Sequence, residues 1–212
     1  MKIVFIADTH DNHRDVILPK GDVLVHAGDM VNVLLHDSIG CVKVIRDVDD
    51  WFGEQDFKKI ICISGNHEYV FQDGLVSSMK NAVYLENEYY EFEGVKFFGS
   101  PYTPHFFGAF NAGEYQLKEM FEKIDDDVDV LITHGPPHGI LDVPSRSDHA
   151  GSHALAEELK RIRPKAHVFG HIHDSYGEFN DGVTQFYNAA MSRAHGDVKE
   201  NKPWVFELEV KR

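Results

Sequence analysis

The chain alternates short apolar runs with longer stretches whose hydrophobic residues recur at helical spacing. The apolar runs are almost uninterrupted, which is typical of strands that are buried on both faces of a sheet. They predict β-strands over residues 2–8, 22–29, 59–66, 95–100, 129–135 and 166–171. The amphipathic stretches between them predict helices over residues 36–54, 115–124 and 152–162.

Two further segments near the C-terminus, 182–191 and 202–210, have the composition of strands, and we expect them to form a closing hairpin or paired strands. Together the elements predict an α/β layered chain with a mainly strand-rich C-terminal part. The sequence shows no repeat and no linker rich in Gly, Ser or Pro, so we expect a single domain over residues 1–212. In such sheets ligands bind beyond the carboxyl ends of the strands, which makes the polar residues there the first candidates for chemistry.

Residues that can ligate a metal follow most of the predicted strands. The candidates are Asp8, His10, Asp29, Asn66, His134, His171 and His173. Residues i and i+2 on an extended backbone point the same way, so Asp8 with His10, and His171 with His173, can each aim two ligands at one point. Carboxylate, imidazole and amide ligands without thiolate suit Mn, Fe, Zn or Co. The set is too large for one tetrahedral ion and suits two ions that share one carboxylate, for which we favour Asp29.

The order of these motifs, DxH, GD, GNH[DE], H and GHxH, resembles the calcineurin-like metallophosphoesterase superfamily. The resemblance runs from Asp8 to His173. The segments DTHDNH, DVLVHAGD, ISGNHE, THGPP and RPKAHVFGHIH are most similar to the small metallophosphoesterase-domain proteins of bacteria and animal brain. This resemblance implies an α/β (α+β) fold with four α/β/β/α layers, in which helices flank a central β-sandwich and a dimetal site lies between the sheets.

The resemblance also implies a role for each motif residue. One divalent ion would be held by Asp8, His10, Asp29 and His173, and the other by Asp29, Asn66, His134 and His171. His67 would contact the phosphate and protonate or stabilise the leaving group, so that the catalytic set is His67, Asn66 and Asp29. A hydroxide that bridges the two ions would attack phosphorus in line with the leaving oxygen. Among the metals that suit these ligands we favour Mn²⁺.

One motif departs from the pattern of the protein-phosphatase branch. That branch has GDxxDRG, whereas Gly28 to Asn32 of this chain reads GDMVN. An amide therefore stands where the second carboxylate of the motif would support His67. Asn32 can accept a hydrogen bond, but it cannot favour an imidazolium ion by charge. This leaves open whether His67 is a general acid or mainly a hydrogen-bond donor, and it argues against a phosphoprotein phosphatase.

Other residues near these motifs allow two interpretations each. His13 could reach the substrate phosphate or could be a solvated loop residue, and His138 could line the pocket wall or lie in an exposed turn. The Pro- and aromatic-rich loop 100–111 could form a pocket floor, form a lid or serve only packing. The histidine inside the second predicted strand, His26, is expected to be structural and not a ligand. Substrate choice is expected to depend on loops such as 100–112 and 136–150.

Charge narrows the range of partners. The chain of 212 residues has 21 Lys and Arg against 35 Asp and Glu, which gives a net charge of −14. Such a surface argues against strong binding to nucleic acid or to an anionic membrane, and it favours a small phosphoester or nucleotide substrate. The sequence leaves open whether the chain forms a homo-oligomer. The chain has no apolar run of membrane-spanning length and no signal-peptide pattern at its start, so we expect a cytoplasmic protein in which Cys41 and Cys62 are buried thiols.

The favoured function is a metal-dependent phosphodiesterase that hydrolyses small (cyclic) nucleotides or similar diesters. A phosphomonoesterase or a nucleotide pyrophosphatase would use the same metals, and the sequence barely separates these activities. A non-catalytic metal-binding scaffold is an alternative of another class. Every motif position holds a residue that can ligate a metal, which favours an enzyme over a scaffold.

Overall fold

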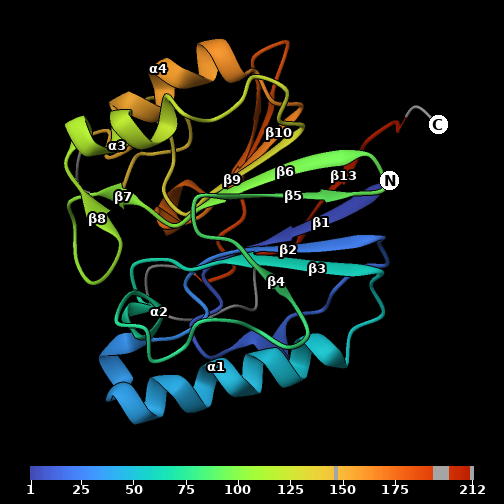
Figure 1. The fold of residues 1–212 in the computed structure, drawn as a ribbon, viewed down its shortest axis with the longest axis vertical. Helices are drawn as coiled ribbons and strands as arrows, with labels where there is room; N and C mark the ends of the chain where they lie inside the picture. The colour runs from blue at the N-terminus through green and yellow to red at the C-terminus, as the bar shows by residue number, and fades with distance from the viewer. Residues whose placement is uncertain (146–147, 193–200, 211–212) are drawn as a thin grey trace.

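Two β-sheets packed face to face form the centre of the molecule (Figure 1). The computed structural model describes residues 1–145, 148–192 and 201–210. The first sheet has the strand order β13-β1-β2-β3-β4. Its strands are β1 (Lys2–Ile6), β2 (Val23–Ala27), β3 (Lys59–Ile63), β4 (Val83–Tyr84) and β13 (Trp204–Glu207). β1 to β4 run parallel, and β13 pairs with β1 in the antiparallel direction.

The second sheet has the strand order β11-β12-β10-β9-β6-β5. Its strands are β5 (Glu88–Phe92), β6 (Val95–Ser100), β9 (Val130–Thr133), β10 (Ala166–Phe169), β11 (Gly177–Asn180) and β12 (Gln185–Asn188). The four inner strands are parallel, while β5 and β11 are antiparallel edge strands. A small parallel pair, β7 (Thr103–Pro104) and β8 (Asn111–Ala112), lies outside both sheets.

Helices cover the outer face of each sheet, which completes four α/β/β/α layers (Figure 1). The helices α1 (Ser38–Gly53) and α2 (Tyr69–Gln72) pack on the first sheet, and α3 (Glu114–Phe121) and α4 (His153–Ile162) pack on the second. Side chains cap the start of two of them: Asp37 accepts a hydrogen bond from Gly40 N–H before α1, and Ser152 accepts one from Leu155 N–H before α4. Short 3₁₀ turns occur at η1 (His13–Asp15), η2 (Val33–Leu35) and η3 (His173–Ser175).

Apolar side chains fill three layers of core, one between the sheets and one beneath each pair of helices. The layer between the sheets contains Phe5 of β1 and Phe97 of β6, both fully buried. Cys41 and Cys62 are buried free thiols, as expected. Within residues 1–145, 148–192 and 201–210, no helix is long and apolar enough to cross a membrane.

The expectation that the last two segments form a hairpin or paired strands is wrong. Segment 182–191 contributes β12, which pairs with β10 and β11 in the second sheet, whereas segment 202–210 contributes β13 on β1 in the first. The hairpin forms one strand earlier, between β11 and β12. Its turn is fixed by Asp181, whose carboxylate accepts hydrogen bonds from the N–H groups of Val183 and Thr184.

The two sheets are joined by backbone hydrogen bonds at the carboxyl end of β1. Ala7 N–H donates to the carbonyl of Ala189 at 2.9 Å, and Met191 N–H donates to the carbonyl of Ala7 at 2.8 Å. This bridge draws the end of β1 toward the ends of β10 and β12. Residues that follow strands of different sheets therefore meet at one place.

Two buried histidines make the stability of the fold depend on pH. His26 of β2 lies 3.0 Å from the hydroxyl of Thr9, and His167 of β10 lies 2.8 Å from that of Thr133. Burial lowers the pKa of each imidazole to about 3. Below a pH of about 6.5 the unfolded chain binds protons that the folded chain does not, so stability present above that pH is lost as the pH falls.

We expect the free energy of unfolding to fall by about 2 kcal/mol for each of these histidines between pH 7 and pH 5. Urea denaturation of the metal-free protein at several pH values measures this effect. The variant His26→Gln should lose its share of the pH dependence, whereas His153→Gln, at an exposed position on α4, should keep it. An unchanged slope in His26→Gln would refute the assignment.

Candidate metal centre

The predicted ligands converge where strands of both sheets end. The loops that follow β1, β2 and β3 in the first sheet carry Asp8, His10, Asp29 and Asn66. The loops that follow β9 and β10 in the second sheet carry His134, His171 and His173. The carboxylate and imidazole ligand atoms of these residues, with that of His67, form three overlapping groups in which the atoms lie within 4.8 Å of one another: Asp8 with His10 and His173, Asp29 with His134 and His171, and His10 with Asp29 and His67. The structure therefore brings together all of the candidate ligands that the sequence indicated.

The first cluster contains Asp8, His10 and His173. The Nε2 atom of His173 lies 3.3 Å from Oδ1 of Asp8 and 3.2 Å from Nε2 of His10. Nδ1 of His10 lies 3.0 Å from the carbonyl of Val31, a contact that orients the imidazole and leaves Nε2 directed at the cluster. Residues far apart in the sequence thus present three ligand atoms to one point.

The second cluster contains Asn66, His134 and His171. The side-chain oxygen of Asn66 lies 2.9 Å from Nε2 of His134 and 2.9 Å from Nδ1 of His171. Nδ1 of His134 lies 2.9 Å from the carbonyl of Ala27, which fixes this ring as Val31 fixes that of His10. The two clusters have the same construction, with imidazole nitrogens arranged around an oxygen.

Asp29 lies between the clusters and faces both. Its Oδ1 atom is 3.4 Å from Nε2 of His134, while its Oδ2 atom is 3.7 Å from Nε2 of His10. The carboxylate is buried, and its Oδ1 also accepts a hydrogen bond from the N–H of His67 at 2.9 Å. With one oxygen toward each cluster, this carboxylate is placed to be shared by two ions.

The electrostatics of the site favour cations. Asp8 and Asp29 are both buried, and burial acts to raise the pKa of each carboxyl, but the neighbouring imidazoles outweigh it and hold both pKa values below the ordinary range. Burial acts to lower the pKa of His134, but the charge of Asp29 raises it to about 9. A divalent cation would take the place of that proton, since metals bind deprotonated ligands. Two carboxylates, an amide oxygen and four imidazoles fit two divalent ions such as Mn²⁺, Fe²⁺, Zn²⁺ or Co²⁺.

Glycines give the backbone room to approach these carboxylates. A Cβ atom on Gly170 would collide with the carboxylate of Asp8, and one on Gly65 would collide with that of Asp29. A side chain at either position would displace a predicted ligand. The glycines of the GNHE and GHIH motifs therefore serve the site directly.

Several ligands lie on left-handed backbone, which corrects the sequence-based explanation of their convergence. The φ angles are 51° at Asp8, 41° at His10, 56° at Asp29 and 66° at His171. An extended backbone does not bring Asp8 and His10 together, nor His171 and His173; tight turns do. Such conformations cost non-glycine residues roughly 1–3 kcal/mol each and tend to cluster at functional sites.

Glu68 supports the centre, a role that was not expected from the sequence. Its buried carboxylate accepts hydrogen bonds from the N–H groups of Asp29 at 2.9 Å, Val31 at 2.9 Å and Gly65 at 2.6 Å. Burial, and then the charge of Asp29, raises the pKa of Glu68 to about 8, and the N–H donors act in the opposite direction. One side chain thus ties the turn that carries Asp29 to the turn that carries Asn66. The glutamate that ends the GNHE motif is the sequence feature that could have indicated this role.

His67 is held as a hydrogen-bond donor. The backbone N–H of Val33 donates to its Nδ1 at 3.1 Å, so the proton of the neutral imidazole lies on Nε2, which is 3.9 Å from Oδ2 of Asp29. Burial lowers the pKa of His67, which also favours the neutral ring. The side-chain oxygen of Asn32 accepts a hydrogen bond from Leu34 N–H. The residue that supports His67 is therefore Val33, through its backbone N–H.

The structure does not bring His13 or His138 into the cavity beside the ligands. His13 is buried against Trp51, and its Nε2 lies 2.9 Å from Oδ2 of Asp47 on α1. His138 stacks on His153 with ring centroids 3.7 Å apart. Neither is among the described residues that line the cavity, so this geometry supports no substrate contact for them.

A cavity of about 560 Å³ opens beside the ligands. Its walls include Asp29, Asn66, His67, His10, His171 and His173 together with Asn12, Asn32, Leu34, Pro104, His105, Phe106, Pro144, Ala150, Ile172, Asp174 and Ser192. The loops 100–112 and 136–150 both contribute, as expected of loops that choose a substrate; Arg146 and Ser147 of the second loop lie outside the described residues. The ligand set therefore faces a space that can hold a small molecule.

Curated proteins resemble this chain over its whole length. Metallophosphoesterase domain-containing protein 1 of Homo sapiens is 32% identical over 241 residues, which cover 100% of this chain and 72% of that protein. UPF0046 protein K07C11.7 of Caenorhabditis elegans is 32% identical over 230 residues, which cover 100% of this chain and 76% of that protein. The similarity to these relatives extends over the whole of this chain and is not confined to one motif.

Solved structures show the same fold. TT1561 of Thermus thermophilus superposes with a TM-score of 0.61 at 12% identity, covering 97% of each chain. A dimetal phosphatase from Danio rerio superposes with a TM-score of 0.57 at 14% identity, covering 89% of this chain and 86% of its own. The family model described as calcineurin-like phosphoesterase matches residues 1–175. The chain therefore belongs to the calcineurin-like phosphoesterase family of metal-dependent phosphoester hydrolases.

Proposed function

We propose that the protein is a dinuclear phosphodiesterase that hydrolyses small, cyclic or similar nucleotide diesters, with Mn²⁺ as the favoured metal. The observation that carries this proposal is the charge of the cavity wall. Among the described residues that line the cavity there are carboxylates, amides and imidazoles, but no Lys and no Arg. Arg in particular is the residue that recognises a phosphate through paired hydrogen bonds.

The charge of the substrate follows from this wall. A phosphate monoester carries about −1.5 to −2 at pH 7, because its second pKa is about 6. A diester has no second ionisable oxygen and carries a single negative charge. A site whose described lining adds no permanent cation to the metals is better matched to the diester.

The residues of the chain have separate tasks in this reaction. The ions, when bound, would supply a water made acidic enough to act as nucleophile and would offset the charge that develops on phosphorus oxygens. One ion would be held by Asp8, His10 and His173. The other ion would be held by Asn66, His134 and His171, and both ions would be bound by Asp29. The neutral imidazole of His67, with its proton on Nε2, would donate a hydrogen bond to the phosphoryl or leaving oxygen.

Size and surface charge agree with a small substrate. The cavity volume of about 560 Å³ falls in the range of roughly 300–1,000 Å³ that is common for small-molecule sites. The net charge of −14 repels a long polyanion such as DNA or RNA.

We expect the Mn²⁺-loaded protein to prefer methyl p-nitrophenyl phosphate over p-nitrophenyl phosphate by about tenfold or more in kcat/KM. The two compounds release the same leaving group and differ by one methyl ester, so the ratio reports mainly on the charge that the site accepts; one uncompensated charge near a protein surface costs more than the 1.36 kcal/mol that corresponds to tenfold. Protein stripped with a chelator and reloaded with Mn²⁺ is assayed on both. Faster hydrolysis of the monoester would indicate a phosphomonoesterase, and no turnover of either by metal-loaded protein would favour a scaffold.

A further inference from the structure

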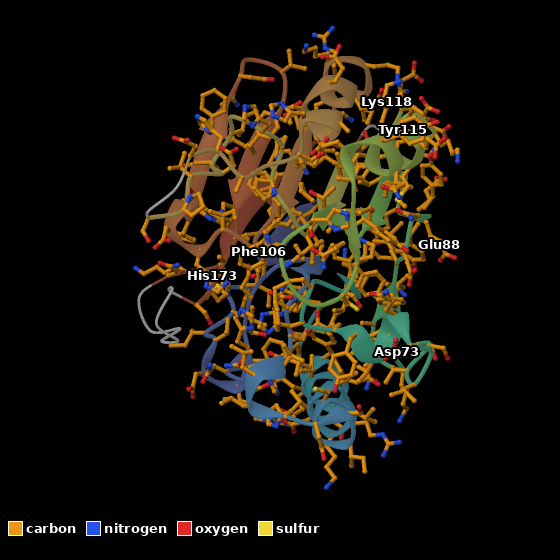
Figure 2. The ribbon with its side chains drawn as sticks, turned by 90° about the vertical axis from the view of Figure 1, so that its left-hand side faces the viewer. Asp73, Glu88, Phe106, Tyr115, Lys118 and His173 are labelled. Atoms are coloured by element: carbon orange, nitrogen blue, oxygen red, sulfur yellow. The ribbon has the colours of Figure 1, made fainter. Side chains whose placement is uncertain are left out.

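An exposed phenylalanine stands at the mouth of the cavity. Phe106 lines the cavity, and its side chain is 76% exposed. Its ring meets that of the predicted ligand His171 edge to face, with centroids 5.3 Å apart and an interplanar angle of 88°. Figure 2 labels Phe106 and His173, which line the same cavity. An aromatic face left open to water beside a reaction centre is suited to a ligand that covers it.

The loop that carries this ring is held firmly by one side chain. Oδ1 of Asn111 accepts a hydrogen bond from Phe106 N–H at 2.7 Å. Its Nδ2 donates to the carbonyls of Phe107 at 3.3 Å, Gly108 at 2.8 Å and Ala109 at 2.8 Å. The amide of Asn111 thus accepts one hydrogen bond and shares its two N–H hydrogens among three carbonyls, which fixes the loop backbone, so the exposure of Phe106 is built into the fold.

The same loop is attached to the backbone of a predicted ligand. Ala109 N–H donates to the carbonyl of Asn66 at 2.8 Å. Gly108 packs directly on that carbonyl with a φ of 81°, and a Cβ atom there would collide with it. The position of Phe106 relative to the metal centre is therefore set by short, direct contacts.

Leu34 supplies a second apolar surface in the same cavity. It lies on η2, lines the cavity and is 73% exposed. The amides of Asn12 and Asn32 and the imidazole of His105 also line the cavity. Two exposed apolar side chains and these polar groups in one cavity suit a planar ring that has hydrogen-bonding edges, such as a nucleobase, better than a purely aliphatic group.

We propose that Phe106 determines specificity by stacking on the nucleobase of the substrate while the phosphodiester lies at the metal centre. This inference rests on the proposed function and names the substrate class as nucleoside phosphodiesters. Stacking of a base on an aromatic side chain does not depend on which base is present, so we expect a general preference for nucleosides and not for one base.

The test compares two substrates that differ only in the base. Adenosine 2′,3′-cyclic phosphate and the 2′,3′-cyclic phosphate of 1-O-methylribose present the same scissile bond. Phe106→Ala should lower kcat/KM for the adenosine compound about tenfold or more and change it for the baseless compound by less than about twofold. Phe106→Trp should retain the preference. Tyr115→Ala removes another exposed aromatic ring, on α3 and away from the cavity, and should change neither (Figure 2).

A binding measurement separates this inference from the proposed reaction. The 3′-methylenephosphonate analogue of adenosine 3′-phosphate, whose C–P bond resists hydrolysis, and methylphosphonate carry the same phosphonate charge and are titrated calorimetrically into Mn²⁺-loaded wild type and Phe106→Ala. Tighter binding of the adenosine compound that is lost in Phe106→Ala supports stacking even if no diester is hydrolysed, in which case only the proposed reaction fails. Equal losses for both substrates, or binding that does not depend on Phe106, would overturn the inference.

Discussion

Replacing Asp29 by Asn should leave a folded protein that cannot hold two metal ions. The amide can still accept the hydrogen bond from His67 N–H, so the local backbone keeps a partner. What is lost is the negative charge between the clusters, where one carboxylate oxygen lies near His134 and the other near His10. We expect the bound Mn²⁺ to fall from two ions per chain to at most one. Because a metal contributes several kcal/mol to charge stabilisation, turnover should fall by about 10³-fold or more.

Metal analysis after equilibrium dialysis, together with diester hydrolysis, measures this effect. The matched control is Asp174→Asn, because Asp174 is an exposed acid that lines the same cavity but belongs to neither cluster. This control should retain both ions and most of the activity. Two tightly bound ions and full turnover in Asp29→Asn would show that the carboxylate does not bridge.

Replacing Glu68 by Gln should weaken the fold and the metal centre together. The oxygen Oε2 accepts hydrogen bonds from Asp29 N–H and Gly65 N–H, and Oε1 accepts one from Val31 N–H. An amide has only one oxygen, so its NH₂ group would face a donor, and one buried N–H would lose its acceptor. This loss should cost about 1–3 kcal/mol of unfolding free energy. Because the residues that orient ligands tune affinity, Mn²⁺ binding should weaken about 10–100-fold.

Urea denaturation of the metal-free protein and Mn²⁺ titration measure the two effects separately. Glu88→Gln is the control, since Glu88 is exposed on β5, away from the cavity (Figure 2). It should match the wild type in both measurements. If Glu68→Gln lowers stability but leaves Mn²⁺ affinity unchanged, Glu68 supports the fold without positioning the ligands.

The ligand set could be predicted from the sequence because the ligands follow strands that are easy to recognise. The carboxyl ends of parallel strands meet at one edge, so Asp8, Asp29 and Asn66 were expected to lie together on the strength of their positions in the chain alone. The same logic applied to His134 and His171 in the second sheet. The sheets are brought together at this edge by backbone hydrogen bonds between Ala7 and residues that follow β12. These hydrogen bonds have no sequence signal of their own.

Other features depend on contacts between residues far apart in the chain, and the pattern did not reveal them. The proton position of His67 is set by the backbone N–H of Val33, which any residue type except proline could supply. His13 follows His10 closely in the sequence but turns to Asp47 and Trp51 of α1. The separation of β12 and β13 into different sheets was likewise decided by which strands had an open edge, a property of the assembled fold.

The central claim is that two ions are bound with Asp29 between them, and anomalous scattering from a crystal of the Mn²⁺-loaded protein tests it most directly. We expect two peaks about 3.5–4 Å apart. One should lie among Asp8, His10 and His173 and the other among Asn66, His134 and His171, with one oxygen of Asp29 toward each. A single peak, or peaks outside these clusters, would contradict the claim.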